Sequence, residues 1–98
     1  MPYQLIFSEE AASHLKFLTA REQRIVIDAV EEQLPYQANI PTRNRQPMRP
    51  NNLATWKLRL GNLRVYYDIE ESEQIVRILA IGVKERNQIR IGNRYLEL

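Results

Sequence analysis

The 98-residue sequence contains no cysteine, one histidine and only three glycines. Without cysteine the chain has no disulfide framework, thiolate metal site or cysteine nucleophile, a composition that fits the reducing cytoplasm. One histidine, His14, is too few for a usual zinc site, and we expect it to be a surface or packing residue of the first helix rather than a catalytic one. Three scattered glycines exclude a glycine-rich phosphate loop. We therefore expect a cytoplasmic protein that needs no metal or other cofactor.

Long hydrophobic segments are also lacking. The first ten residues, MPYQLIFSEE, do not place an apolar stretch after a basic region, so they do not predict a signal peptide. The longest apolar run, Ile75 to Val83, is interrupted by Arg77 and is too short to span a bilayer. A hydrophobic content of 44% and a charged content of 27% predict a single globular domain over residues 1–98.

The N-terminal part of the chain favours a strand followed by two helices. Residues 3–7 predict the strand, and Ser8 is a suitable N-cap for the first helix. Thr19 and Glu22 have the spacing of a capping box, which predicts the start of a second helix, and Pro35 is expected to end it. Two helices joined this closely predict an antiparallel helical hairpin.

The rest of the chain favours strands. Residues 35–52 hold four of the five prolines and predict an extended, ordered loop. Alternating segments on either side of Gly61-Asn62 predict a two-residue hairpin, and residues 74–83, apolar on both faces, predict a central strand. The tail from Lys84 fits a short helix and an irregular strand equally. The predicted fold class is α+β, an antiparallel sheet with both helices on one face, in the order β-α-α-β-β-β.

One stretch has no acidic residue at all. Between Arg43 and Arg64 the chain carries six cations, whereas the rest of the chain holds 8 of the 14 bases and all 12 acids. The six cations are Arg43, Arg45, Arg49, Lys57, Arg59 and Arg64. A patch of this kind predicts a polyanionic partner, most commonly a nucleic acid, with a solvated basic loop as the alternative.

The predicted hairpin brings some of these cations together. Arg59 faces Arg64 and Lys57 faces Tyr66 if Gly61-Asn62 joins the two strands. Like charges directly across a strand pair destabilise it by about 1 kcal/mol or less, and a bound phosphate would relieve that repulsion. Splayed side chains in water are the alternative. Tyr66 either stacks on a base or packs on the sheet.

Such a cluster is also suited to RNA cleavage. RNA supplies its own nucleophile, the 2′-hydroxyl, so the protein needs a base, cations for the charge on phosphorus and an acid for the leaving 5′-oxygen. Lys57 is the candidate base, because the neighbouring guanidinium groups of Arg59 and Arg64 lower a lysine pKa from its reference value of about 10.4. The acidic residues near position 70 are expected to form a solvated turn rather than a magnesium site.

Two segments, LRLGNLRVYYD at residues 58–68 and ILAIGVKER at residues 78–86, resemble the RelE/ParE toxin superfamily. With the size and the two leading helices, this resemblance covers nearly the whole chain. RelE-type members are toxins of type II toxin–antitoxin pairs that cut mRNA in the ribosomal A site, whereas ParE-type members poison DNA gyrase. The resemblance implies a cognate antitoxin as partner, mRNA and the ribosome as targets, and a monomeric toxin that forms a hetero-oligomer with its antitoxin.

The resemblance also implies site residues. The basic residues of the RelE-type pattern fall on Lys57, Arg59 and Arg64, and then on Lys84 or, with a small shift, Arg86. The late tyrosine of that pattern falls near Arg90, where this chain has no aromatic residue, and Tyr95 lies beyond it. The predicted roles are a base for Lys57, phosphorane stabilisation for Arg59 and Arg64, and an acid for Lys84 or Arg86. The predicted RNA contacts are Arg43, Arg45, Arg49, Tyr66 and Arg90. A gyrase inhibitor and an inactive antitoxin-binding relative are the alternatives.

Overall fold

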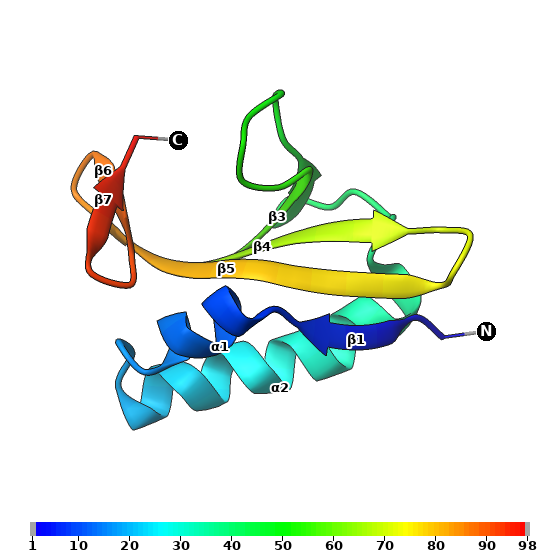
Figure 1. Cartoon of the computed structure of the whole chain (residues 1–98), viewed down its shortest axis with the longest axis horizontal. Coiled ribbons are helices and arrows are strands. Elements are labelled where there is room, and N and C mark those ends of the chain that lie inside the picture. The colour runs from blue at the N-terminus through cyan, green and yellow to red at the C-terminus, as the bar shows by residue number, and fades with distance from the viewer. Residues whose placement is uncertain (1, 98) are drawn as a thin grey trace.

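The computed structural model describes residues 2–97, and its fold is α+β as predicted, with both helices on one face of a sheet (Figure 1). No helix within these residues is long and apolar enough to cross a membrane. In chain order the elements are β1 (Gln4–Phe7), α1 (Glu9–Leu15), α2 (Ala20–Gln37), β2 (Arg45–Pro47), β3 (Trp56–Leu60), β4 (Leu63–Glu70), β5 (Ile75–Glu85), β6 (Gln88–Ile91) and β7 (Arg94–Leu96).

The sheet is built around β5, the predicted central strand. The strand order is β2-β3-β4-β5-β6-β7 with antiparallel neighbours, and β1 pairs in parallel with the first part of β5. The sheet is therefore not wholly antiparallel as predicted, and α1 and α2 run out and back beneath it after β1 (Figure 1). The predicted hairpin register is confirmed from Trp56 opposite Tyr67 to Leu60 opposite Leu63.

The second helix does not end at Pro35 but continues to Gln37. Proline has no N–H, so at this position it removes a single helical hydrogen bond, and its fixed φ suits a helix. The Pro35 carbonyl accepts a hydrogen bond from the Tyr3 backbone N–H at 2.7 Å. The last turn of α2 is thereby tied to the beginning of β1.

One short strand, β2, was not predicted, and the tail, for which a short helix and an irregular strand were the two alternatives, forms strands β6 and β7. Within the proline-rich loop, a turn between Thr42 and Arg45 starts β2, which pairs with β3. The tail forms no helix, because β5 extends to Glu85 and a turn containing Arg86, at φ 59°, leads into the β6–β7 hairpin. Each of these strands pairs with a neighbour in the sequence, but three or four residues are too few to show an alternating pattern.

Each face of the sheet has its own apolar core. The larger core lies between the sheet and the helices and includes Val26, Val30, Leu34, Leu58, Val65, Tyr67 and Ile78. The smaller core lies on the opposite face, where β6–β7 and the loop before β3 rise above the sheet (Figure 1). Its buried members are Ala54, Tyr66, Ala80, Ile89 and Ile91.

Gly82 allows β6 to approach β5 closely at the point where the sheet turns upward. A Cβ atom at this position would lie 2.8 Å from Cγ2 of Ile89 and 2.9 Å from the carbonyl oxygen of Arg90. Any larger residue would push β6 away from β5. The β6–β7 wall of the open face therefore depends on a glycine at this position.

Helix α1 covers the part of the β5 edge that lies between β1 and β6. Nδ1 of His14 accepts a hydrogen bond from the Ile81 backbone N–H at 3.2 Å. At the other end of α1, the N–H of the N-cap residue Ser8 donates to the Ile78 carbonyl at 2.9 Å. His14 is thus a packing residue, as expected from the sequence, and burial lowers the pKa of its imidazole.

Candidate functional site

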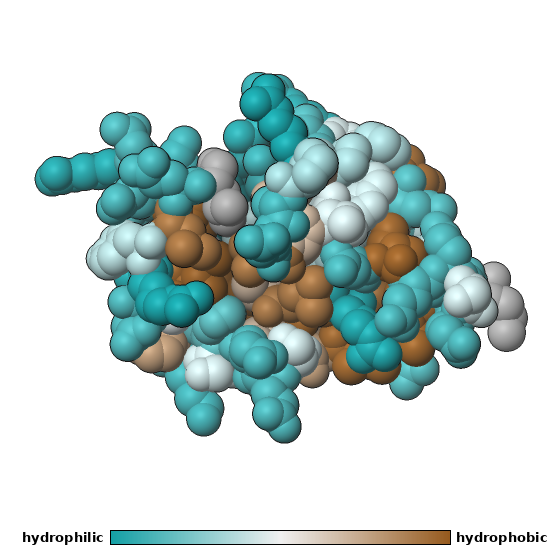
Figure 2. Space-filling view, turned by 45° about the horizontal axis from the view of Figure 1, so that its top comes forward, coloured by the Kyte–Doolittle hydropathy of each residue, from teal (hydrophilic) through white to brown (hydrophobic). Residues whose placement is uncertain are grey.

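Lys57, Arg59, Arg64 and Lys84 lie on the face of the sheet that the helices leave open. The confirmed register puts Arg59 opposite Arg64, which in turn pairs with Gly82 on β5. Lys84 follows two residues after Gly82 and so lies on the same face. Polar side chains surround apolar patches on the surface that Figure 2 shows. Four cations from three strands thus share one surface.

The electrostatic environment of Lys57 follows from this placement. Burial of its half-exposed side chain lowers the pKa of Lys57, and the positive charges of Arg64, Arg59 and Lys84 lower it further, in that order of influence. At a given pH, a larger fraction of Lys57 is therefore in the neutral amine form than for an isolated lysine. Proximity of these four side chains was predicted, and the structure brings them together.

Arg64 is held in place rather than extended into solvent. It is only 6% exposed, and its NH1 donates to the Gly61 carbonyl at 2.7 Å and to the Leu63 carbonyl at 3.0 Å. Burial lowers the pKa of this guanidinium, and the positive charge of Arg59 also lowers it. The hairpin turn therefore fixes the position of the Arg64 charge beneath the open face.

Tyr66 does not offer a stacking surface. It lies on the same face as Lys57, but its side chain is 1% exposed and packs with Ala54, Ala80, Ile89 and Ile91. Burial raises the pKa of its phenol to about 12. The prediction that Tyr66 contacts RNA is therefore wrong, because the loop before β3 and the β6–β7 hairpin cover its ring.

Arg45 is also unavailable for phosphate, contrary to prediction. It is 2% exposed, and its guanidinium donates to the Ile40 carbonyl at 2.9 Å and to the side-chain oxygens of Gln33 and Gln37. These acceptors surround the C-terminal end of α2, where the helix dipole favours a cation. Arg45 therefore stabilises the junction between α2 and β2.

Arg90 and Tyr95 belong to a separate cluster. Nε of Arg90 forms an ion pair with the Glu85 carboxylate at 2.9 Å, and the Tyr95 hydroxyl donates to the same carboxylate at 3.1 Å. Arg90 and Tyr95 face each other across β6–β7, on the opposite side of that hairpin from Ile89, the partner of Lys84. The structure therefore brings neither of them to Lys57.

Arg86 does not join the Lys57 cluster either. It lies in the turn between β5 and β6 and lines a different depression, together with Glu85 and Tyr95. Arg43 is exposed near the start of β2, away from the groove described next. Of the two candidates for the general acid, Lys84 and Arg86, the structure thus places Lys84 on the same face as Lys57.

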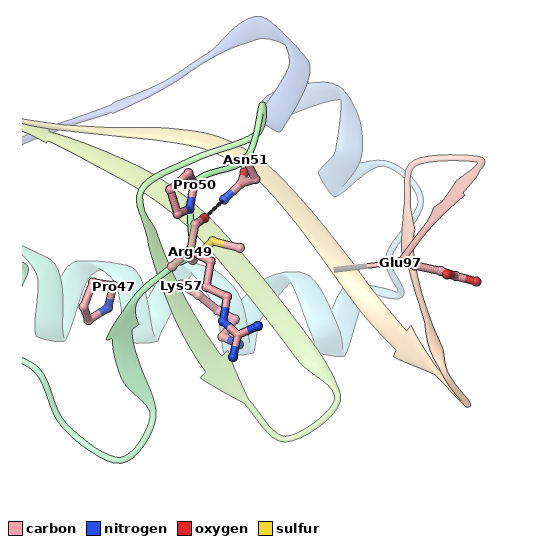
Figure 3. Close-up of a pocket in the computed structure, with 7 residues that line it drawn as sticks. Pro47, Arg49, Pro50, Asn51, Lys57 and Glu97 are labelled. Atoms are coloured by element: carbon pink, nitrogen blue, oxygen red, sulfur yellow. Dashed lines mark hydrogen bonds between the residues drawn. The ribbon is translucent and has the colours of Figure 1, made fainter.

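A groove of about 540 Å³ opens beside Lys57 (Figure 3). The loop between β2 and β3 forms one wall, with Arg49 directed toward the Lys57 side, and the Glu97 carboxylate opposite points away from Lys57. Its lining residues are Pro47, Met48, Arg49, Pro50, Asn51, Lys57 and Glu97. Within residues 2–97, no three His, Cys, Asp or Glu side chains are placed to hold a metal ion.

Asn51 is the residue of this groove that sequence reasoning missed. Its Nδ2 donates to the carbonyls of Arg49 at 2.6 Å and Ala54 at 3.0 Å, and its Oδ1 accepts from the N–H groups of Leu53 and Ala54. The dipeptide Pro50-Asn51 was the available signal, because asparagine commonly bonds to the backbone two residues later in a turn. Asn51 thereby shapes the loop that carries Arg49.

Comparisons with known proteins agree with this architecture. Residues 5–88 match the family described as ParE toxin of type II toxin–antitoxin system, parDE. The chain is similar to a chain of the RelBE2 toxin–antitoxin complex from Mycobacterium tuberculosis, at 26% identity and a TM-score of 0.73, covering 86% of this chain and 100% of that one.

A second solved structure shows the same fold. It is the archaeal RelE–RelB complex from Pyrococcus horikoshii, matched at 19% identity and a TM-score of 0.70 over 88% of this chain and 99% of that one. No curated protein sequence gives a significant match.

Proposed function

We propose that this chain, which belongs to the family of ParE toxins of type II toxin–antitoxin systems, acts by cleaving mRNA without a metal ion. The observation that carries the proposal is the position of Lys57. Its amine lies on an open face with three other cations, and burial together with the charges of these cations lowers its pKa. A groove that can receive a polyanion opens beside it.

In the proposed reaction, the neutral amine of Lys57 takes the proton of an RNA 2′-hydroxyl. The bond from that oxygen to phosphorus forms while the bond from phosphorus to the 5′-oxygen breaks. Exposed Arg59 contacts the phosphoryl oxygens on which charge develops, and Arg64 adds its positive charge from its buried position beneath them. Lys84 donates a proton to the leaving oxygen. The products are a 2′,3′-cyclic phosphate and a 5′-hydroxyl end.

The proposal predicts a definite pH dependence. A general base acts in its deprotonated form, so cleavage should accelerate as pH rises through the pKa of Lys57. Because burial and the surrounding cations lower that pKa, the rise should begin at lower pH than for an ordinary lysine. Lys57→Arg, which stays protonated, should abolish this dependence in the measured pH–rate profile.

The decisive experiment separates the general-base function of Lys57 from its positive charge. Lys57→Arg keeps the positive charge but cannot give up its proton, so we expect cleavage of mRNA in a reconstituted translation reaction to slow by about 10²–10⁴-fold. Arg24→Lys, at an exposed cation on α2 and therefore on the helix-covered side of the sheet, should cleave at the wild-type rate. Full activity of Lys57→Arg, or product ends other than a cyclic phosphate, would exclude this mechanism.

The same reaction tests the proposed partners. We infer that the substrate is mRNA on the ribosome, and that a cognate antitoxin binds the toxin into a hetero-oligomer, as toxin and antitoxin pair in the two solved complexes. Cleavage of ribosome-bound mRNA and of the same RNA free in solution should be compared. Equal rates on both substrates would remove the ribosome from the proposal.

The family match favours a second candidate, inhibition of DNA gyrase by binding. That function predicts blocked supercoiling and intact mRNA, and it does not require Lys57 to deprotonate. A gyrase supercoiling assay with wild-type protein and Lys57→Arg distinguishes the two candidates. If both proteins block supercoiling equally and neither cuts mRNA, gyrase is the target. A chain that does neither would be an inactive antitoxin-binding relative.

A further inference from the structure

We propose that Arg49 stacks its guanidinium on an unpaired RNA base in the groove beside Lys57, and that Asn51 positions it to do so. The inference rests on the proposed RNA cleavage and defines its substrate as a single-stranded segment with one base seated in the groove. Nucleotides in single strands are commonly recognised by stacking on aromatic rings or on arginine planes.

The lining of the groove leaves the stacking role to arginine. The groove volume of about 540 Å³ lies within the range of about 300–1,000 Å³ typical of small-ligand sites. Pro47, Met48 and Pro50 supply apolar surface, and Lys57 supplies charge. None of its lining residues is aromatic, so the one extended planar side chain directed toward Lys57 is that of Arg49 (Figure 3).

Arg59 is exposed, but it is not among the residues that line the groove, and the other nearby arginines have guanidinium groups that are already engaged. Arg45 donates to three oxygens at the end of α2, and Arg64 donates to two carbonyls of the hairpin turn. Arg90 is paired with Glu85, and neither ion pair within residues 2–97 includes Arg49. Arg49 is also exposed on its loop. Its planar group is therefore available to a ligand.

The loop holds Arg49 in a defined place before any ligand arrives. Asn51 bonds to the Arg49 carbonyl, and the Met48 N–H donates to the Thr55 carbonyl at 2.8 Å. Thr55 is in turn fixed by two hydrogen bonds to the Asp68 carboxylate, each 2.7 Å. The segment 47–55 contains two prolines and no glycine, so little backbone freedom is lost on binding.

The test uses a 2′-O-methyl dodecanucleotide that carries one 2-aminopurine and cannot be cut. Binding is measured by fluorescence anisotropy, and stacking is measured by quenching of 2-aminopurine. Arg49→Lys keeps the charge but loses the plane, so it should raise the Kd by about 5- to 150-fold and remove the quench, with an unchanged salt dependence. Arg49→Gln should also reduce the slope of log Kd against log salt by about 0.7.

Asn51 and its neighbour Asn52 form a matched pair for the positioning role. Asn51→Ala should weaken both the quench and the affinity, whereas Asn52→Ala should leave both unchanged. Asn51→Asp keeps the acceptor for the Leu53 and Ala54 N–H groups, and it should restore part of the quench. A role confined to stability would lower the melting temperature of Asn51→Ala and leave the quench intact, which would refute the positioning.

The outcomes distinguish this inference from the proposed function. If wild-type protein cleaves mRNA but Arg49→Lys binds and quenches like wild type, the stacking inference is wrong and RNA cleavage stands. If wild-type protein neither binds nor cuts RNA, the proposed function is wrong, and the stacking inference that rests on it is wrong as well. If a twelve-residue oligoglutamate peptide binds as tightly as the RNA in an Arg49-dependent manner, the groove is a site for an acidic protein segment, and the inference is overturned.

Discussion

The two faces of the sheet differ in what they bury, although the same strands supply both. On β3 and β4, Leu58 and Val65 enter the core between the sheet and the helices, whereas Lys57 and Arg64 face the other side. The helix-covered face is a continuous apolar core. The open face combines a small core with four cations that repel one another. Substitutions on the two faces should therefore separate stability from activity.

The largest stability effect should come from the helix-covered face. Ile78→Ala removes a side chain that is fully buried there, and we expect a loss of about 2–5 kcal/mol in the free energy of unfolding, measured in urea. Ile40→Ala, at a side chain that is 50% exposed, should change it by less than about 0.5 kcal/mol. Under folding conditions both variants should still bind RNA. Loss of RNA binding by folded Ile78→Ala would show that the faces are not independent.

Arg45 and Arg43 sharpen the comparison within the basic stretch. Arg45→Ala leaves the oxygens of Gln33, Gln37 and Ile40 without their donor, which should cost about 2–4 kcal/mol of stability in a urea titration. Arg43→Ala, at an exposed position, should have little effect on stability. Equal effects of the two substitutions would contradict the structural role assigned to Arg45.

Gly82 links the two faces, because it sets the distance between β5 and the hairpin that walls the open face. Gly82→Ala should destabilise the protein by about 1–3 kcal/mol through steric overlap with Ile89 and Arg90. The overlap should also loosen β6, seen as faster amide hydrogen exchange at Ile89 and Ile91. Unchanged exchange and melting temperature would mean that the sheet absorbs the added methyl group.

The smallest effect should come from His14, which joins the helices to the sheet. Burial and the charge of Arg94 lower its pKa, and the charge of Glu10 raises it, with a net lowering. Below about pH 6.5 the unfolded chain therefore binds more protons than the folded one, so stability should fall as pH falls toward the folded pKa. His14→Asn keeps an acceptor for Ile81 and should flatten this dependence, measured as unfolding free energy from about pH 5 to about pH 7.5. A profile as steep as that of wild type would point to another titrating group.

The hairpin and the helices could be predicted from the sequence because their signals are local. The alternation on either side of Gly61-Asn62 sets the register, and Ser8 and Thr19 cap the helices as predicted. The short strand β2 was not predicted, and β6 and β7 could not be distinguished from a helix, because segments of three or four residues show too little periodicity.

The candidate site was predictable only in part, for a related reason. Arg45 and Arg49 are the same residue type in one loop, and their sequence context does not separate them. Arg45 is buried because it bonds to acceptors at the C-terminal end of α2, whereas Arg49 lines the groove. Likewise, Tyr66 is covered by strands that the sequence did not reveal.

The central position of β5 has a consequence for the order in which the chain can fold as it is made. β1 is synthesised first, yet its strand partner lies about 70 residues later, at Ile75–Ile78. The helical hairpin likewise packs on a sheet whose middle strand, β5, begins at Ile75. A chain interrupted before residue 75 would expose the apolar side of α2 and lack Lys84. Nascent chains should therefore stay inactive until β5 has been synthesised.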